Sequence, residues 1–227
     1  MTTQSVPQTV SDVKSDYIVA KFGGTSVANF DAMSRCSEII VADKSVRIVA
    51  VSASAGVTNH LVALCKSSIT PQQRQEHIDG VLAIQQAILD ELSLDADLAV
   101  GFNETLKAFQ TLALETLTTD QQHDELLSFG ERLSSYLFAQ VLRLKGLNAD
   151  RFDVRQVLKT DSQFGKATPN VSATAQAAKE YLIPLLDDQV IVTQGFVGSD
   201  EFGQTTTLGR GGSDYSAALL AEAINAK

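Results

Sequence analysis

The sequence contains few cysteines, histidines and prolines, and no tryptophan. Its two cysteines, Cys36 and Cys65, are too few for a disulfide framework and show no CxxC spacing, so we expect two reduced thiols. Its three histidines, His60, His77 and His123, form no HxxxH or HExxH pair, which argues against a zinc site. With only 4 Pro and 14 Gly among 227 residues, collagen-like and low-complexity classes are excluded.

Long hydrophobic runs and an excess of basic residues are also missing. The longest apolar runs, such as residues 39–42 and 48–51, are too short to span a bilayer. Residues 1–16 are polar and lack the apolar region of a signal peptide, so we interpret them as a flexible tail. The 27 acidic residues exceed the 18 basic ones, and the net charge of -9 disfavours nonspecific binding to nucleic acid or anionic membranes. We expect a cytoplasmic protein with small-molecule partners.

Strand-like and helix-like segments alternate along the rest of the chain. The strand-like runs are residues 17–22, 47–52, 149–154 and 189–197, and the helical patterns are residues 28–42, a long segment opened by Pro71, 98–117, 124–145 and 213–226. This alternation predicts an α/β fold whose mainly parallel sheet is covered by helices. The two helical patterns after Pro71 predict a helical hairpin between the second and third strands. We expect residues 17–227 to form a single domain.

Two glycine clusters stand before expected helices, at residues 21–26 (KFGGTS) and 209–214 (GRGGSD). Exposed backbone N–H groups and the helix dipole make such turns suitable for anions. Neither cluster fits GxxxxGK[ST] or GxGxxG, so the common nucleotide motifs are absent, and a single glycine pair is more often a plain turn. The cations that accompany the glycines, Lys21 and Arg210, favour an anion site.

A third loop, residues 52–59 (SASAGVTN), follows the second expected strand. Thr58 or Asn59 is expected to cap the next helix, a role compatible with ligand binding. Ligands of open α/β sheets bind at the carboxyl ends of the strands. We therefore expect this loop, both glycine clusters and residues 194–195 to face one crevice.

Glu131 lies between two apolar faces of the expected helix 124–145. A lone buried carboxylate is costly, so we expect a cationic or hydrogen-bond-donating partner for it. A structural ion pair and a ligand-binding role both satisfy this expectation. Gly130, which permits the close approach of another backbone, favours the ligand-binding role.

Six segments together resemble aspartate kinases of the amino-acid kinase superfamily, and most closely the monofunctional, lysine-sensitive type. The six segments occur in order across residues 17–226, and the combination of the first with the last is highly specific. They are residues 21–27 (KFGGTSV), 51–59 (VSASAGVTN), 129–132 (FGER), 152–155 (FDVR), 192–196 (VTQGF) and 205–217 (TTTLGRGGSDYSA).

The resemblance implies a three-layer αβα sandwich and an activity. The implied reaction is the ATP-dependent phosphorylation of the β-carboxylate of L-aspartate to 4-phospho-L-aspartate, the first step towards lysine, threonine and methionine. Mg²⁺ is expected on the ATP rather than at a metal site of the protein, and the full-length enzyme is expected to be a homodimer. The lack of a catalytic histidine fits this chemistry, because the aspartate carboxylate is already ionised at neutral pH.

The resemblance also implies roles for individual residues. The implied catalytic residues are Lys21 and Asp214. The implied substrate-binding residues are Ser52, Thr58, Glu131, Arg210 and Ser213, and those near the nucleotide phosphates are Lys21, Gly23, Gly24, Thr25, Gly211 and Gly212. Arg210 corresponds to the arginine that holds the α-carboxylate, whereas the resemblance leaves open whether Glu131 or Asp214 holds the α-ammonium.

Aspartate kinases continue beyond the last helix of this sequence with more of the nucleotide-binding half and with paired ACT domains. We therefore interpret residues 17–227 as the N-terminal part of such a catalytic domain, truncated at its C-terminal end. A chain of this extent is expected to be weakly active or inactive alone.

Several alternatives remain open. The chain could be a kinase for glutamate or acetylglutamate, although GRGGSD and SASAG argue against both, or the kinase half of a bifunctional aspartate kinase and homoserine dehydrogenase. It could also be a non-catalytic fragment that binds an amino acid or dimerises. A Rossmann oxidoreductase is disfavoured, because the first glycine turn lacks GxGxxG and no acidic residue follows the second strand.

Overall fold

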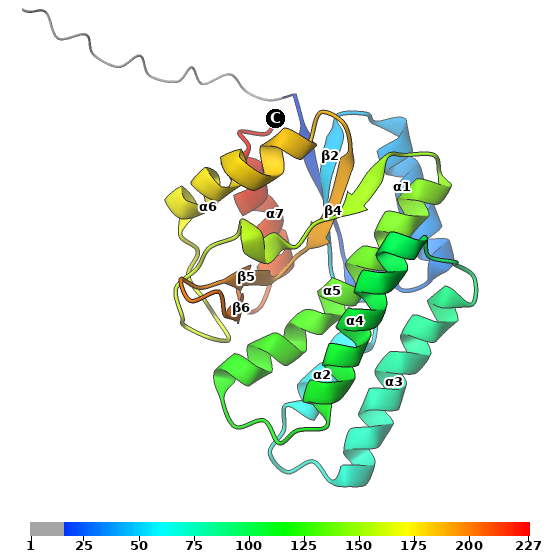
Figure 1. Ribbon diagram of the computed structural model, residues 1–227, viewed down its shortest axis with the longest axis vertical. Helices are drawn as coiled ribbons and strands as arrows, with labels where there is room; N and C mark the ends of the chain where they lie inside the picture. Colours follow the sequence, from blue (N-terminus) through cyan, green and yellow to red (C-terminus); the bar gives the residue numbers. More distant parts are fainter. Residues whose placement is uncertain (1–15) are drawn as a thin grey trace, which may run out of the picture.

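The computed structural model describes residues 16–227, and its centre is a four-stranded parallel sheet (Figure 1). The strands lie in the order β1 (Ile18–Phe22), β2 (Val46–Val51), β4 (Val190–Gln194) and β3 (Ala149–Arg151). The central pair is almost wholly buried, as expected for β-branched and apolar runs in a sheet covered on both faces. The predicted tail lies, apart from Asp16, outside the described residues.

Helices cover both faces of the sheet, which gives the predicted three-layer α/β arrangement. On one face, α1 (Phe30–Ala42) and α5 (Asp120–Leu144) share a core with the strands. On the other face lie α7 (Gly212–Ala223) and α6 (Val171–Ala177). The latter continues through the π-helical turn η3 (Ala178–Leu182) and the 3₁₀ turn η4 (Ile183–Leu185). Figure 1 shows the sheet between these two helical layers.

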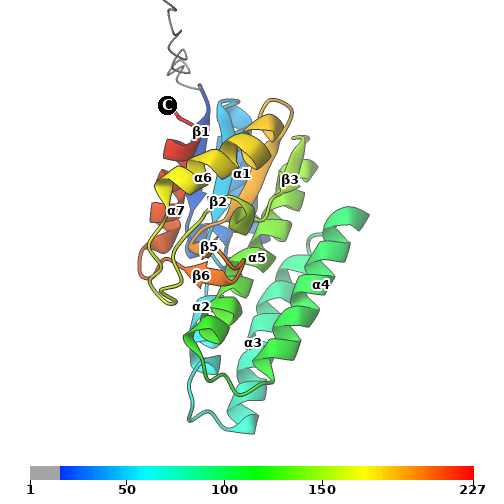
Figure 2. The same ribbon diagram turned by 60° about the vertical axis from the view of Figure 1, so that its left-hand side comes forward.

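The predicted helical hairpin is present as α3 (Pro71–Leu89) and α4 (Ala96–Ala113). Pro71 and a capping box between Thr70 and Gln73 begin α3. The hairpin packs outside α5, away from the sheet (Figure 2), and a separate apolar core joins it to α5 and α2 (Val57–Leu64). Within residues 16–227 we find no helix with the length and apolar character needed to cross a membrane.

The strand expected over residues 189–197 is in fact two strands. Strand β4 ends at Gln194, the backbone turns at Phe196 with φ of 68°, and β5 (Val197–Ser199) then pairs antiparallel with β6 (Thr205–Thr207). The turn is held from outside the segment, because the Phe196 N–H donates to Ser216 Oγ of α7 at 2.8 Å. The sequence prediction missed this second sheet.

Other boundaries also differ from the predictions. The third strand ends at Arg151, because Asp153 caps the 3₁₀ turn η2 (Val154–Gln156). The helix predicted over residues 28–42 begins at Phe30, and Asn29 is its N-cap. The 3₁₀ turn η1 (Gly24–Val27) precedes this helix. The last two predicted helices span residues 120–144 and 212–223 rather than 124–145 and 213–226.

Candidate functional site

The carboxyl ends of β1, β2 and β4 lie level with one another. In the register of the sheet, Phe22 pairs with Val51 and Val51 pairs with Gln194. Just beyond these pairs, the Ser52 N–H donates to the Phe22 carbonyl at 3.0 Å and the Gly195 N–H to the Val51 carbonyl at 2.9 Å. The loops that leave the three strands are therefore neighbours, as the sequence predicted.

Two glycines allow these loops to pack closely. A Cβ atom on Gly24 would lie 2.9 Å from the Ala53 carbonyl oxygen, and one on Gly195 would lie 2.8 Å from Ser213 Cβ. Real Cβ atoms essentially never approach other atoms this closely, so a side chain at either position would push two loops apart. The first glycine cluster and the SASAG loop thus touch, and β4 ends directly against the start of α7.

The loops enclose a cavity of about 400 Å³. It brings together most of the predicted site residues, from β1, the SASAG loop, α2, α5 and the start of α7. They are Lys21, Gly24, Ser52, Thr58, Glu131, Arg210, Gly211, Gly212, Ser213 and Asp214. Two predicted residues lie outside the lining: Gly23, where a Cβ would be 3.6 Å from Lys21 Nζ, and Thr25, an exposed residue of η1.

An ion pair and a hydrogen bond cross the cavity between the sheet and α7. Lys21 Nζ, at the end of β1, lies 2.9 Å from Asp214 Oδ1 in the first turn of α7. Beside it, the Ser52 hydroxyl donates to Ser213 Oγ at 3.1 Å. The Asp214 side chain is 78% exposed, so water screens this pair strongly. The ammonium of Lys21 is thereby held at the cavity with an anion already beside it.

Glu131 reaches the same cavity from α5 and is 6% exposed. A hydrogen bond from the Ala53 backbone is the donor contact that the sequence predicted, but none of the ion pairs in residues 16–227 includes Glu131. Burial raises the pKa of this carboxyl to about 7, against the lowering effect of that hydrogen bond. A carboxylate in this position is suited to a ligand that brings its own positive charge.

Arg210 is the second charged group of the cavity without a charged partner. It is exposed, and no carboxylate in the described part of the chain forms an ion pair with it. Its neighbours Gly209 and Gly211 have φ of 74° and 78°, a left-handed backbone that favours glycine. The loop therefore presents a free guanidinium, whose fork of donors fits a carboxylate or a phosphate.

The cap of α2 differs from the prediction. Gly56, with φ of 91°, is the N-cap, so neither Thr58 nor Asn59 caps the helix. Thr58 instead lies in the first turn of α2 and lines the cavity.

Sequence reasoning did not single out Ser54 and Phe196, which also line the cavity. Ser54 Oγ is buried without a hydrogen-bond partner, and Phe196 replaces the predicted residues 194–195 at the cavity wall. Ser54 belongs to the SASAG segment and Phe196 to the VTQGF segment of the family resemblance. This membership was the one feature of the sequence that could have predicted their place at the cavity.

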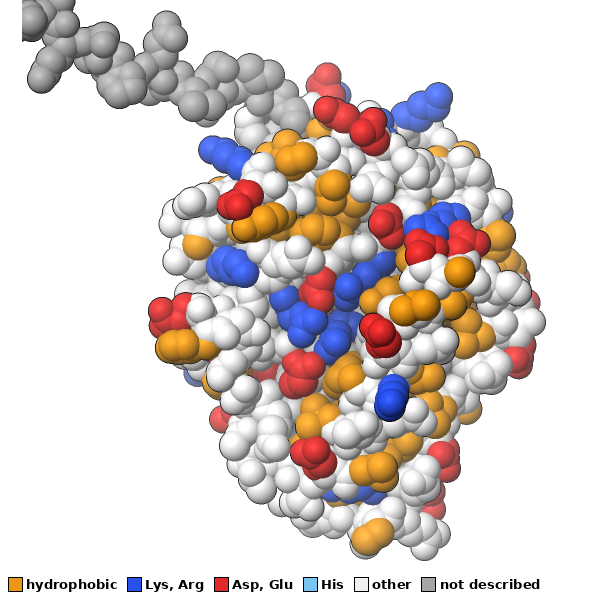
Figure 3. All heavy atoms as spheres, viewed as in Figure 1, with side chains coloured by type: hydrophobic (Ala, Val, Ile, Leu, Met, Phe, Trp, Pro, Cys, Tyr) orange, Lys and Arg blue, Asp and Glu red, His pale blue; other side chains and the backbone are white. Residues whose placement is uncertain are grey.

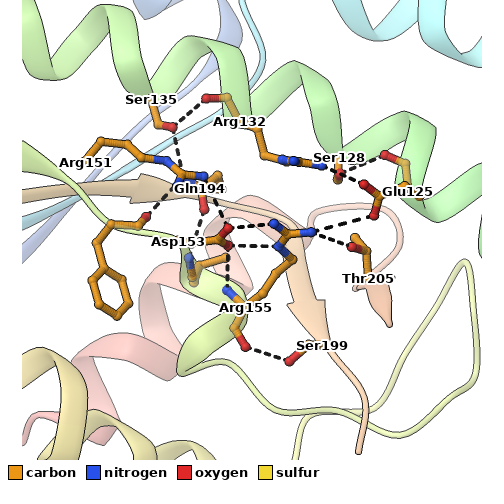
Figure 4. A network of polar contacts seen from close by, with 12 residues as sticks. Glu125, Ser128, Arg132, Ser135, Arg151, Asp153, Arg155, Gln194, Ser199 and Thr205 are labelled. Atoms are coloured by element: carbon orange, nitrogen blue, oxygen red, sulfur yellow. Dashed lines mark hydrogen bonds and ion pairs between the residues drawn. The ribbon is translucent and has the colours of Figure 1, made fainter. Parts of the chain in front are cut away.

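The FDVR motif builds a polar network instead of the cavity (Figure 4). Arg155 binds Asp153 through two nitrogens, at 2.9 and 2.6 Å, and Thr205 Oγ1 of β6 at 2.9 Å. On α5, Arg132 Nη1 lies 2.7 Å from Glu125 Oε1. On the face of the molecule that Figure 1 views, Lys and Arg side chains gather near the middle, with Asp and Glu side chains beside them (Figure 3). The network pairs three arginines with two carboxylates, and its contacts join η2, α5 and β6.

Metal ligands and reactive thiols are not assembled at the cavity. Within residues 16–227, no three His, Cys, Asp or Glu side chains are placed to hold a metal ion together. His60 and His77, which the sequence reading treated as scattered, do meet, with their Nδ1 atoms 3.1 Å apart. Cys36 and Cys65 are free thiols, and burial raises the pKa of Cys65 to about 11.

Relatives of known identity match nearly all of the chain but only part of their own length. Lysine-sensitive aspartokinase 3 of Escherichia coli (strain K12) is 46% identical over 214 residues, which cover 93% of this chain and 47% of that protein. An aspartokinase of Chlamydia trachomatis is 37% identical over 216 residues, which cover 92% of this chain and 47% of that protein. The chain thus spans about half the length of the curated relatives it matches.

Solved structures show the same fold. The crystal structure of E. coli aspartokinase III in complex with aspartate and ADP superposes with a TM-score of 0.88 over 92% of this chain and 47% of that chain, at 46% identity. The same enzyme in complex with lysine and aspartate superposes with a TM-score of 0.89 over 93% of this chain and 48% of that chain. The sequence profile of the amino acid kinase family matches residues 16–227. With this match over almost the whole chain, and with the fold that the resemblance implied, the chain belongs to the amino acid kinase family.

Proposed function

We propose that this chain is the acceptor-binding part of an aspartate kinase, which transfers the γ-phosphoryl group of ATP to the β-carboxylate of L-aspartate. The observation that carries the proposal is the pairing, in one cavity, of a free guanidinium with a buried carboxylate that lacks a charged partner. An amino acid presents the complementary charges. The names of the relatives, and the aspartate and ADP in a matching structure, support the choice of substrates.

In this proposal, Arg210 holds the α-carboxylate of aspartate and Glu131 holds the α-ammonium. Asp214 is a weaker candidate for the ammonium, because it is exposed and already paired with Lys21 at 2.9 Å. An ammonium group would stabilise Glu131 more than Asp214, since it would offset the cost that burial places on the ionised form of Glu131. The hydroxyls of Ser52, Thr58 and Ser213 would orient the substrate between these two charges.

Phosphoryl transfer between two anions requires positive charge and N–H donors at the transferring group. Lys21 is placed to supply the charge, and the amides of Gly24 and Gly211 the donors, with Asp214 positioning the lysine. Mg²⁺ would be bound by the triphosphate. The β-carboxylate is ionised at neutral pH and needs no general base. Gly23 and Thr25 lie outside the cavity lining, and the Gly212 N–H already donates to the Gly209 carbonyl at 3.0 Å, so we assign these three residues no contact with the phosphates.

The proposal extends to the whole enzyme. Because the chain spans about half the length of the relatives, residues 17–227 would be the N-terminal part of a catalytic domain, and the remainder would complete the nucleotide site. We propose a cytoplasmic enzyme of amino-acid biosynthesis that acts as a homodimer.

The reaction is tested by trapping the acyl phosphate with hydroxylamine. With the whole enzyme, ATP and Mg²⁺, we expect aspartyl hydroxamate from aspartate, less product from glutamate or N-acetylglutamate, and a rate about a hundredfold lower for Lys21→Ala. Equal or greater product from either of the other acceptors would contradict the aspartate assignment. Aspartate binding without any product from the whole enzyme would identify the alternative, a non-catalytic amino-acid-binding module.

A further inference from the structure

Asp124 is a buried carboxylate of α5 that lies outside the cavity lining. Among residues 16–227, two residues donate hydrogen bonds to its oxygens. The Gly165 N–H donates to both oxygens, at 3.0 and 2.9 Å, and Thr207 donates its N–H to Oδ2 and its hydroxyl to Oδ1, both at 2.8 Å. The side chain thus bridges a helix to two segments that are more than 40 residues away in sequence.

Both partners of Asp124 adjoin the loop that carries Arg210. Thr207 is the last residue of β6, three positions before the arginine. The Gly165 carbonyl oxygen would lie 3.1 Å from a Cβ on Gly209, so the two segments are in direct contact there. Moving Thr207 or Gly165 would therefore displace the loop and its guanidinium.

The same helix carries Glu131, seven residues after Asp124. Residues separated by seven positions lie on the same face of a helix, about 10 Å apart along its axis. Helix α5 therefore holds one charge of the cavity directly and holds the loop of the other through Asp124. The separation of Glu131 and Arg210 depends on this helix.

We propose that Asp124 is a positioning residue for amino-acid recognition, which clamps the Arg210 loop at a fixed separation from Glu131. The contacts of the clamp are the hydrogen bonds from Gly165 and Thr207 to Asp124. The effect of the clamp on aspartate binding rests on the proposed function. Stabilising the fold alone is a poor explanation of Asp124, because a buried carboxylate without a cationic partner is costly even when hydrogen-bonded.

Two substitutions separate the contacts from the charge. Asp124→Ala removes every hydrogen bond. Asp124→Asn can keep a hydrogen bond to each partner, because an amide nitrogen in place of Oδ1 can donate to Thr207 Oγ1 while Oδ2 still accepts from the two backbone amides. It loses only the second contact of the Gly165 N–H, at 3.0 Å to Oδ1. Asp120→Asn is the matched control, since Asp120 is an exposed residue one turn earlier that makes none of these contacts.

Two readouts are followed: amide hydrogen exchange at Gly165 and Thr207, and the dissociation constant of L-aspartate measured by calorimetry. For Asp124→Ala we expect faster exchange at both amides and aspartate binding weakened on the order of tenfold. Asp124→Asn and Asp120→Asn should remain close to wild type. A mere loss of stability would lower the fraction of folded chains but leave the affinity of the folded ones unchanged.

The Arg210→Ala background tests whether Asp124 acts through the arginine. If it does, adding Asp124→Ala there causes no further loss of affinity. An additive loss, or wild-type affinity and exchange in folded Asp124→Ala, would overturn the proposal. If Asp124→Ala does not fold, Thr207→Val replaces it. That variant should speed exchange at residue 207 and weaken aspartate binding by a smaller factor, and no change in either would overturn the clamp.

Hydrogen exchange also separates this proposal from the proposed function. If the wild-type chain binds no aspartate, the proposed function fails, while exchange at Gly165 and Thr207 still decides whether the clamp exists.

Discussion

At the residue scale, the carboxyl of Glu131 makes the cavity sensitive to pH. Glu131 is buried, and burial raises its pKa to about 7, so it changes charge near neutrality. Recognition of an amino acid in this cavity should therefore depend on pH through Glu131.

We predict that aspartate binds roughly tenfold more weakly at pH 6 than at pH 8, because most Glu131 side chains are protonated at the lower pH and cannot pair with the α-ammonium. Calorimetric titrations at the two pH values measure this difference. Glu131→Gln should bind weakly at both. Equal wild-type affinities at pH 6 and pH 8 would rule out Glu131 as the ammonium partner.

Glu131 also affects folding in a defined direction. The pKa of glutamic acid in an unfolded chain is about 4.3, so the folded chain binds this proton more tightly. The stability that the protonated form contributes is fully present below that value and is lost as the pH rises through about 7. Without ligand, Glu131→Gln should therefore be more stable than wild type at pH 8, by about 1 to 3 kcal/mol.

Urea unfolding of both chains at pH 8 and pH 5 checks this prediction. The advantage of Glu131→Gln should shrink at pH 5, where the wild-type side chain is protonated and neutral in the folded state. An advantage of the same size at both pH values would show that ionisation is not its cause.

At the element scale, the loop between β1 and α1 depends on the missing side chain of Gly24. A Cβ there would meet the Ala53 carbonyl oxygen at 2.9 Å, and both sides of this contact are backbone. Gly24→Ala should separate the loop from the SASAG segment, reduce stability by about 1 to 3 kcal/mol and weaken aspartate binding. Thermal unfolding and calorimetry measure the two effects.

Gly203→Ala is the control for that substitution. It lies in the turn between β5 and β6 with φ of 76° and no atom within 4 Å of a built Cβ. The left-handed backbone alone should cost about 1 kcal/mol of stability there, with aspartate affinity unchanged. If Gly24→Ala matches this control in both measurements, the close approach of the loops does not shape the cavity.

The elements that the sequence predicted best are those whose own residues carry the signal. Helices α3, α4 and α5 have apolar residues at helical spacing, and β2 is a continuous apolar run. By contrast, α6 is built of small residues without an apolar stripe, and β6 is three threonines. The break after β4 was missed because a distant hydroxyl, Ser216 Oγ of α7, holds the turn at Phe196.

At the scale of the whole molecule, the cavity draws on both helical layers and on the sheet between them. Glu131 comes from α5 on one face, Asp214 from α7 on the other, and Lys21 from β1. The glycine turns in the sequence, with the cations beside them, were enough to predict that Lys21 and Arg210 lie at the cavity. Asp124 could not be predicted, because its partners Gly165 and Thr207 become neighbours only when the layers assemble.

The central claim is that the assembled cavity recognises aspartate, and the most direct test is a calorimetric titration of the folded chain at pH 8. L-Aspartate is the ligand and L-glutamate, which is longer by one methylene, is the control. We predict saturable binding of aspartate and binding of glutamate at least about tenfold weaker. No binding of aspartate by a folded chain, or equal binding of the two amino acids, would contradict the account.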